Sequence, residues 1–397
     1  MNREDFPILD TNIIYFDNAA TTLKPKSVVD EITKYYTLYT ANAHRGDYDN
    51  SLIVDNLYEG VRTKVKDLIN ADSEKEIVFT KGATESLNMI VKCYMKYVLK
   101  SGDEVLLTKS EHASLVLPWL ELEKELGIVI KYIELDDKYK VNYENVIKQV
   151  TDKTKVIALA QVSNVISDER PIKELGEYTS KKGIYLVVDG AQSVPHMKVD
   201  VKSLNIDFLA FSSHKMLGPT GVGVLYGKFK YLDKMHPLTV GGGMNNYFEA
   251  NGDLEYNNLP TRLEAGTQNI SGVIGFGKAI DYLNNLGYDK IRNYEKELRN
   301  YLIQELEKNE NVTIYNKDSG TNTVIFNVNG IFPQDTAIYL NTKHICIRAG
   351  NHCAKLLKDE VGVKNTCRVS LYFYNTKEEI DKLIEALKEK DILKMVI

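Results

Sequence analysis

A lysine stands between two apolar segments of this chain, where an amine is costly to bury. Residues 207–227 read DFLAFSSHKMLGPTGVGVLYG, and Lys215 lies in the short polar stretch that separates two β-rich runs. Lysine is almost never fully buried unless its amine is paired or chemically used. A solvated loop lysine is the simpler interpretation of Lys215 alone, so the choice depends on its neighbours.

Asp189 and Gln192 supply such neighbours in the segment VVDGAQ, which ends an earlier apolar run. A buried carboxylate needs a cation or strong hydrogen-bond donors, and a protonated pyridine nitrogen is such a cation. An aldehyde needs an amine like that of Lys215 to form an imine. Pyridoxal phosphate combines both requirements, so Asp189 together with Lys215 predicts a site for this cofactor. Asp189 alone is weak support, because structural ion pairs look the same.

The segment TKGATESLN predicts where the phosphate of such a cofactor binds. Ala83 and Thr84 stand between a β-rich run and a helical pattern, and the free N–H groups at the start of a helix bind phosphate. Taken alone, Thr84 is equally well explained as an ordinary N-cap. Further donors for the phosphate are available at Ser212, His214 and Thr267.

Alternating β-rich and amphipathic helical segments place these residues at one edge of a sheet. The expected strands are residues 76–80, 104–108, 128–135, 155–162, 184–190, 207–212 and 222–227. Several are continuously apolar, which is typical of a mostly parallel sheet covered on both faces. Such sheets bind ligands beyond the carboxyl ends of their strands. The polar residues expected together at that edge are Thr84, His112, Asn164, Asp189 and Lys215.

The pattern changes at about residue 285. Charged helical stretches at 287–308 and 376–390 flank short strands, which indicates a smaller α+β domain. We therefore expect two domains. The large one covers 15–284, and the small one joins 1–14 to 285–397.

The composition is that of an ordinary globular chain. Of its 397 residues, 43% are hydrophobic and 26% charged, and the net charge is −5 without any basic block, so nucleic acid and anionic membranes are not expected partners. The start, MNREDFPILD, lacks the apolar core of a signal peptide, and no apolar run has the length of a membrane helix. The four cysteines show no disulfide spacing, so a cytoplasmic location is expected.

Short blocks along the chain resemble, in order, the motifs of one enzyme family. They are YFDNAATT, HRG, TKGATESLN, SEHAS, QVSNV, VVDGAQSVPH, FSSHKMLGPTGVGVLYG, EAGTQN, RAGNHCA and CRVSLYFYNTKEEID. The chain resembles class V aminotransferase-fold enzymes and, more narrowly, the SUF-type (group II) cysteine desulfurases. The resemblance implies an α/β chain of fold type I of the PLP-dependent transferases. Its large domain would hold a mostly parallel sheet, and its C-terminal domain would be a smaller α+β unit.

The resemblance implies a role for each matching position. Lys215 is expected to join the cofactor covalently and shuttle protons, Asp189 to pair with the pyridine nitrogen, and Gln192 to bond the phenolic oxygen. His112 is expected to stack on the ring, although a core histidine would look the same. The phosphate is expected to be held by Ala83, Thr84, Ser212, His214 and, from the neighbouring subunit, Thr267. The residues expected to bind the substrate are Asn164, Arg368 and His44.

The segment RAGNHCAKLL contains the nucleophile that the resemblance implies, Cys353. Its thiolate would take sulfur from L-cysteine, leaving alanine and an enzyme persulfide. The sulfur would then pass to an acceptor protein of the SUF system for iron–sulfur cluster assembly. A helix expected to begin near Cys353 would favour the thiolate. Cys93 and Cys346 are interpreted as core residues.

Some positions depart from the family pattern. Asn351 stands where histidine is common, Ala83 where threonine is common, and AKLL replaces small residues and a proline after Cys353. These changes bear on partner choice and rate rather than on reaction type. Residues 241–262, rich in Gly and Asn, form a long excursion that leads into Thr267. We expect it to reach across a homodimer with shared active sites, because such loops are usually functional or contact a partner.

Other functions are weighed against this one. A metal site could use His344, Cys346, His352 and Cys353, but their spacing matches no common zinc motif, so no metal is expected. The same fold could carry out transamination or decarboxylation, from which only Cys353 discriminates, and the sequence does not decide whether selenocysteine is also a substrate. The remaining alternative is a cofactor-free scaffold for cluster assembly, against which stand Lys215, Asp189, Gln192 and His112 together.

Overall fold

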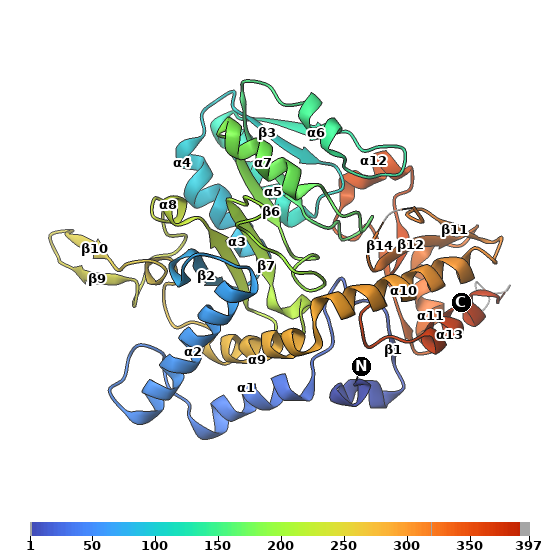
Figure 1. Cartoon of the computed structure of the whole chain (residues 1–397), viewed down its shortest axis with the longest axis horizontal. Helices are drawn as coiled ribbons and strands as arrows, with labels where there is room; N and C mark the ends of the chain where they lie inside the picture. Colours follow the sequence, from blue (N-terminus) through green and yellow to red (C-terminus); the bar gives the residue numbers. More distant parts are fainter. Residues whose placement is uncertain (1, 319, 390–397) are drawn as a thin grey trace.

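The computed structural model describes residues 2–318 and 320–389. A seven-stranded sheet forms the centre of the molecule, in the order β2-β8-β7-β6-β5-β3-β4 (Figure 1). Its strands are β2 (Ile77–Thr80), β3 (Glu104–Thr108), β4 (Val129–Ile133), β5 (Thr154–Ala160), β6 (Tyr185–Asp189), β7 (Phe208–Ser212) and β8 (Gly223–Gly227). Neighbouring strands are parallel except that β8 is antiparallel to β7 and β2. The expected mostly parallel sheet is confirmed.

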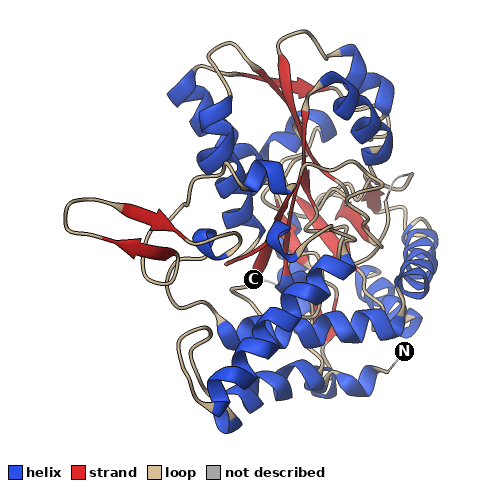
Figure 2. Cartoon of the chain, turned by 60° about the vertical axis from the view of Figure 1, so that its left-hand side comes forward, coloured by secondary structure: helices blue, strands red, loops and turns tan. Residues whose placement is uncertain are grey.

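Alternate residues of the strands pack into two apolar layers, because successive side chains of a strand point to opposite faces. In β7, Leu209 and Phe211 enter one cluster and Phe208 and Ala210 the other. Figure 2 shows the sheet with helices on both sides. The helices of this part are α1 (Lys26–Leu38), α2 (Asp49–Leu68), α3 (Ala83–Met89), α4 (Lys96–Val98), α5 (Ala113–Leu126), α6 (Tyr143–Lys148), α7 (Ile172–Lys182), α8 (Phe229–Leu232) and α9 (Ile270–Leu286).

Helices α1, α2 and α9 pack together closely because two glycines of α9 leave room for their neighbours. A Cβ atom at Gly275 would lie 2.6 Å from Ile32 of α1, and one at Gly277 would lie 2.4 Å from Val61 of α2. Both distances are shorter than atoms tolerate, so larger side chains there would push the helices apart. This layer carries the segments that flank α2 and precede α9.

The C-terminal part has its own four-stranded antiparallel sheet, in the order β11-β12-β15-β14. Its strands are β11 (Val312–Ile314), β12 (Thr323–Val328), β14 (Arg348–Gly350) and β15 (Thr366–Ser370), and its helices are α10 (Tyr288–Leu306), α11 (Pro333–Thr342), α12 (Lys358–Val361) and α13 (Lys377–Leu387). A capping box between Thr376 and Glu379 begins α13.

The expected α+β pattern of this region is confirmed. Residue 390 of the expected last helix, like the end of the expected small domain, lies outside the described residues. The N-terminal segment joins this part, because β1 (Ile14–Tyr15) pairs with β13 (Ile345–Cys346). The expected domain boundary at 284/285 stays a prediction.

The excursion at 241–262 contains a β-hairpin that the sequence did not predict. Strands β9 (Asn245–Phe248) and β10 (Leu254–Tyr256) pair antiparallel. The hairpin projects away from the body of the molecule (Figures 1 and 2). Its residues are mostly exposed, including Phe248 and Leu254. An isolated hairpin is marginally stable in water, so this one is suited to contact another surface.

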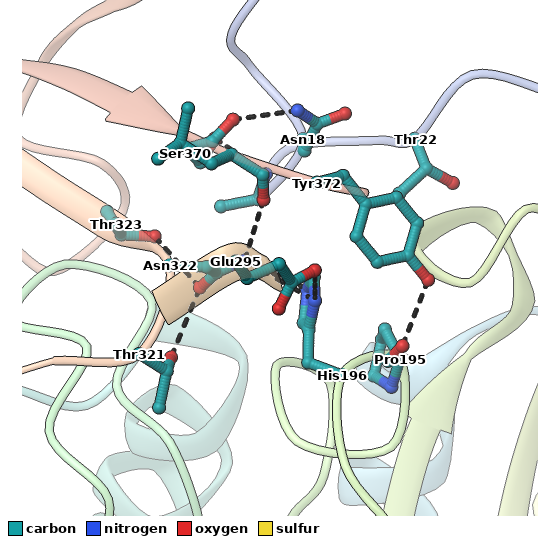
Figure 3. A network of polar contacts seen from close by, with 12 residues as sticks. Asn18, Thr22, Pro195, His196, Glu295, Thr321, Asn322, Thr323, Ser370 and Tyr372 are labelled. Carbon is teal, nitrogen blue, oxygen red and sulfur yellow. Dashed lines mark hydrogen bonds and ion pairs between the residues drawn. The ribbon is translucent and has the colours of Figure 1, made fainter. Parts of the chain in front are cut away.

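A buried polar network fixes the small domain against the loop that follows β6 (Figure 3). His196 Nδ1 lies 2.8 Å from Glu295 Oε1 of α10, and Asn322 Nδ2 lies 3.2 Å from His196 Nε2. Tyr372 donates its hydroxyl to the carbonyl of Pro195 at 2.9 Å. Burial raises the pKa of Glu295, opposed by His196. Buried polar groups held this way specify a single arrangement of the C-terminal part against the central sheet.

Within residues 2–318 and 320–389, every helix falls short of the length and apolarity needed to cross a bilayer.

Candidate active site

A cavity of about 180 Å³ opens at the carboxyl edge of the central sheet, facing β15 of the small domain. It brings together most of the residues that the sequence predicted for a site. Those lining it are Ala83, Thr84, His112, Asn164, Asp189, Gln192, Ser212, His214, Lys215 and Arg368. Cys353, Thr267 and His44 are not among its lining residues.

Lys215 and Asp189 face the same cavity from the ends of neighbouring strands. Asp189 is the last residue of β6, is 5% exposed, and accepts a hydrogen bond from the Ala191 amide at 2.9 Å. Burial raises the pKa of Asp189, opposed by that amide and by the charge of Lys215. Burial also lowers the pKa of Lys215 to about 8, opposed by Asp189. A buried carboxylate with so few donors fits a cationic pyridinium.

Gln192 and Ser212 are positioned by the backbone of other segments. The Gln192 amide donates to the carbonyl of Ala19 at 2.8 Å, which holds the side chain at the cavity wall. Ser212 ends β7 and accepts a hydrogen bond from the Ala83 amide at 2.8 Å. Ala83 begins α3, which continues through a π-helical segment (Ile90–Met95) into α4. Thr84 lies 2.7 Å from the hydroxyl of Ser114. Hydroxyl and amide donors therefore gather at one end of the cavity, as a phosphate requires.

The two histidines of the cavity are held neutral by burial. His112 is the N-cap of α5, and its Nδ1 accepts a hydrogen bond from the Ser114 amide at 3.1 Å, which leaves the ring proton on Nε2. Burial, with the nearby charge of Lys215, lowers the pKa of His112 to about 4. The pKa of His214 is lowered to about 4 by burial and by Lys215. A neutral ring at the position of His112 suits stacking on a flat cofactor.

Arg368 lies on β15 and is 1% exposed. Its Nη1 donates to the carbonyl of Asn164 and its Nη2 to Asp17 Oδ1, both at 3.0 Å. Its Nε has no hydrogen-bond partner among the described residues, although it is buried. A guanidinium with a spare donor in a cavity fits a carboxylate ligand. The side chain of Asn164 instead donates to the carbonyl of His352 at 2.8 Å.

Cys353 is half-buried in a turn rather than at a helix start, so that prediction was wrong. His352 and Cys353 both have left-handed backbones, with φ of 51° and 60°, which no helix contains. The next elements are a short 3₁₀ helix (Lys355–Leu357) and the single turn of α12. The turn is fixed by the Ala113 amide, which donates to the Cys353 carbonyl at 2.8 Å.

Sequence reasoning missed two residues beside the predicted ones, Arg348 and Asp17. Arg348 Nη2 lies 3.4 Å from Cys353 Sγ, so a guanidinium rather than a helix terminus is the positive group at the thiol. Arg348 also lines the cavity and stands opposite Arg368 in the β14–β15 pair. Only the strand register reveals this neighbour. The sequence did offer one sign that each residue belongs to the site. Arg348 lies in the motif RAGNHCA, and Asp17 lies in the motif YFDNAATT.

The remaining predicted positions lie elsewhere. Thr267 borders a second cavity of about 330 Å³, and both Thr267 and His44 are exposed. Cys93 is buried, as expected, whereas Cys346 is only half-buried. In the part of the chain that the structure describes, no three His, Cys, Asp or Glu side chains are grouped as metal ligands.

The sheet, the lysine after β7 and the acid at the end of β6 define a pyridoxal-phosphate-dependent enzyme of fold type I. Residues 14–383 match the Aminotransferase class-V family, and the chain belongs to that family. Pyridoxal 5′-phosphate is its cofactor, and the cavity residues fit that group.

Similar proteins include two probable cysteine desulfurases. That of Halalkalibacterium halodurans is 41% identical over 389 residues, covering 97% of this chain and 96% of that protein. That of Staphylococcus aureus is 39% identical over 393 residues, covering 97% and 95%. Among solved structures, the apo cysteine desulfurase of Thermococcus onnurineus has a TM-score of 0.93 at 38% identity, covering 97% of this chain and 96% of that one. The S-sulfonic acid form of Escherichia coli CsdA has a TM-score of 0.91 at 34% identity, covering 100% and 98%.

Proposed function

We propose that this protein is a cysteine desulfurase that converts L-cysteine to L-alanine and keeps the sulfur as a persulfide on Cys353. The observation that carries the proposal is the position of Cys353. Its carbonyl is bonded to the first residue of α5, next to His112, and its thiol lies beside Arg348, which lines the cavity. The likeness to proteins named cysteine desulfurases supports the same reaction.

The residues of the cavity divide the work of binding and proton transfer. When bound, pyridoxal phosphate supplies an electron sink for the charge that forms at the substrate α-carbon. Arg368 binds the substrate carboxylate through its spare donor. Lys215 would hold the cofactor covalently and, with its pKa lowered to about 8 by burial, would exchange a proton with the α-carbon near neutral pH. Asp189, buried at the end of β6, would hold the pyridine nitrogen of the cofactor.

Cys353 carries the sulfur chemistry. Its thiolate attacks the sulfur of the substrate, so that an S–S bond forms as the Cβ–S bond breaks. The three-carbon fragment gains protons at Cβ and Cα and leaves as alanine. Arg348, 3.4 Å from Sγ, stabilises the anionic sulfur. His112, neutral and with its proton on Nε2, would hold the cofactor ring by stacking on it.

The sulfur then passes to an acceptor protein, which we infer to belong to a SUF-type system for iron–sulfur cluster assembly. Cys353 is half-buried at the surface, so a partner can approach it. The assignment to the SUF-type subgroup rests on the sequence motifs. A cytoplasmic location stays a prediction.

We also infer a homodimer with shared active sites. Large apolar side chains are exposed on α1, at the start of α2 and around the hairpin, and exposed apolar surface supports an interface there. They are Tyr36, Leu38, Tyr48, Leu52, Val240, Phe248 and Leu254. Thr267, expected to contact the cofactor phosphate of the neighbouring subunit, is exposed and does not reach the cavity of its own chain.

The reaction is tested by incubating the purified protein with L-cysteine and a reductant, and measuring alanine and sulfide together. Equal amounts are expected. Cys353→Ala should release no sulfide yet keep the absorbance of the bound cofactor, whereas Cys93→Ala serves as the matched control and should retain activity. Formation of pyruvate and ammonia, or undiminished sulfide from Cys353→Ala, would contradict the proposal.

A further inference from the structure

A buried guanidinium ties together the two segments that stand outside the cavity. Arg62 of α2 is 2% exposed. Its Nη1 and Nη2 donate to the two carboxylate oxygens of Glu264 at 2.8 and 3.0 Å, and its Nε donates to Glu59 at 2.8 Å. Nη1 also donates to the carbonyl of Ile77 at 2.9 Å. The planar guanidinium of Arg62 donates on one edge to Glu264 and on the other to Glu59. This arrangement fixes the orientation of both carboxylates as well as their distances.

Glu264 anchors the segment that carries Thr267. Besides Arg62 of α2, it accepts the Phe79 amide of β2 on Oε1 at 2.7 Å, so Glu264 is bonded both to α2 and to the central sheet. Thr267 follows three residues later, in the segment EAGTQN. Its hydroxyl accepts a hydrogen bond from the Asn42 side chain at 3.4 Å. The Thr267 segment is therefore held at Glu264 by Arg62 and Phe79, and at Thr267 itself by Asn42.

Glu59 anchors the segment that carries His44. Its Oε1 lies 3.1 Å from His44 Nε2, and the His44 amide donates to Asp55 Oδ1 at 2.5 Å. The backbone of His44 is left-handed, with φ of 59°, a conformation that persists in a bulky residue only where its surroundings impose it. The hydrogen bond with Glu59 raises the pKa of His44. Although burial opposes it, bonds from His44 and Arg62 lower the pKa of Glu59 to about 2.

His44 and Thr267 are exposed, whereas Arg62 and Glu264, which anchor their segments, are buried and Glu59 is half-buried. Buried ion pairs contribute little net stability compared with apolar residues of the same size. Stability alone therefore does not explain why two exposed polar side chains are held in fixed positions. A second surface that docks on them would explain it. Tyr48, which precedes α2, and Leu52 at its start are also exposed apolar side chains, as expected where a partner covers the surface.

We propose that Arg62, Glu59 and Glu264 form a clamp that positions His44 and Thr267 for the cavity of the partner subunit. The inference rests on the proposed homodimer and deepens it. The three clamp residues are positioning residues, since they act through His44 and Thr267. The groups offered to the partner are an imidazole that favours its cationic form and a hydroxyl, which suit an anionic phosphate or carboxylate.

The test uses mixed dimers in which one subunit carries Lys215→Ala, so that only one cavity works. Glu59→Gln keeps the size of the side chain and removes its charge. Placed on the Lys215→Ala subunit, it should lower kcat/KM by about tenfold or more, because the working cavity receives its His44 from that subunit. Placed on the other subunit, it should leave the activity at that of the dimer with Lys215→Ala alone. Equal effects in both placements would overturn the proposal.

Two further variants separate the possible failures. Thr267→Ala in the same two placements tests the shared site itself, and symmetry there would sink the proposed dimer arrangement. If the loss of activity depended on the placement of Thr267→Ala but not on the placement of Glu59→Gln, the clamp would be overturned while the shared site would stand. Arg62→Lys keeps the charge but loses the fork, and it should behave as Glu59→Gln does.

A measurement on the cofactor-free homodimer completes the test. Titration of the His44 ring by NMR should give a lower pKa in Glu59→Gln than in the wild type, because the hydrogen bond that raises it is weakened. Glu74→Gln is the matched control, since Glu74 pairs with Lys66 at the surface. An unchanged His44 pKa in Glu59→Gln would contradict the link between the clamp and His44.

Discussion

Lys215 and Cys353 approach the same chemistry from very different settings. Lys215 follows a fully buried strand, and its loop is held by the N-terminal segment, since Thr21 and Thr22 donate to the carbonyl of His214. Cys353 lies in a half-buried turn with two successive left-handed residues and does not line the cavity. The difference indicates that the proposed cofactor anchor is held rigidly, whereas the proposed sulfur carrier stands on a strained surface turn.

The largest effect is expected from removing the amine of Lys215. Lys215→Ala should lower desulfurase activity by about 10³-fold or more, because both the covalent anchor and the proton-transfer group are lost. Alkylation of Cys353 in the same variant should be unchanged, since the turn has its own hydrogen bonds. Mass spectrometry of the alkylated protein measures the second effect, and a large change there would show that the two regions are not independent.

Asp17→Asn should raise the KM for cysteine by about tenfold with a smaller change in kcat, because the ion pair that orients Arg368 becomes a hydrogen bond to a neutral amide. Steady-state kinetics with alanine as the readout measures both constants. Asp10→Asn, at an exposed position, is the matched control. A fall in kcat alone would mean that Asp17 does not orient the carboxylate-binding group.

Arg348→Met should slow alkylation of Cys353 at neutral pH several-fold, since the guanidinium 3.4 Å from Sγ no longer stabilises the thiolate. Arg348→Lys should restore part of the rate. Iodoacetamide labelling of the cofactor-free protein gives the rates directly. If the methionine variant reacted as fast as the wild type, Arg348 would act only on the substrate side of the cavity.

The smallest effect is expected at Lys24, which contacts the loop that carries Lys215. Among the described residues its amine donates to carbonyl and hydroxyl oxygens, at Thr21, Thr22 and His214, and burial lowers its pKa to about 7. Because the folded pKa lies below the ordinary value of 10.5, the charge destabilises the fold below about pH 7, and this cost fades as the pH rises toward 10.5.

Lys24→Met should therefore unfold at higher urea concentration than the wild type near pH 7, and the gap should narrow at higher pH. Lys26→Met, which removes an exposed surface charge on α1, is the control. A gap that stays constant with pH, or a variant less stable than the wild type, would show that the Lys24 charge is needed to hold the Lys215 loop.

The strand ends could be predicted from the sequence because each strand of the large domain is a local apolar run. The residues that follow them, such as Asp189 and Lys215, then fall at one edge by topology alone. The cavity wall from the small domain could not be predicted in the same way. Arg348 meets Arg368 only through the antiparallel register of β14 and β15, and Asp17 reaches Arg368 from the other end of the chain.

The turn at Cys353 and the hairpin show a second limit. AKLLKDEVG has a helical composition, yet its helix begins after Cys353 and ends at Gly362, whose backbone is left-handed. The hairpin strands β9 and β10 have no apolar alternation because neither face packs on the core. A local sequence pattern therefore does not predict an element that packs on something other than the core of its own chain.

The most direct test of the account is to reduce the purified holoenzyme with borohydride and map its peptides. The central claim is that the amine of residue 215 is joined to the aldehyde of pyridoxal phosphate. The account predicts a pyridoxyl tag on Lys215, in the peptide that spans FSSHKMLGP, and no tag on Lys24. A tag on another lysine, or none, would contradict it.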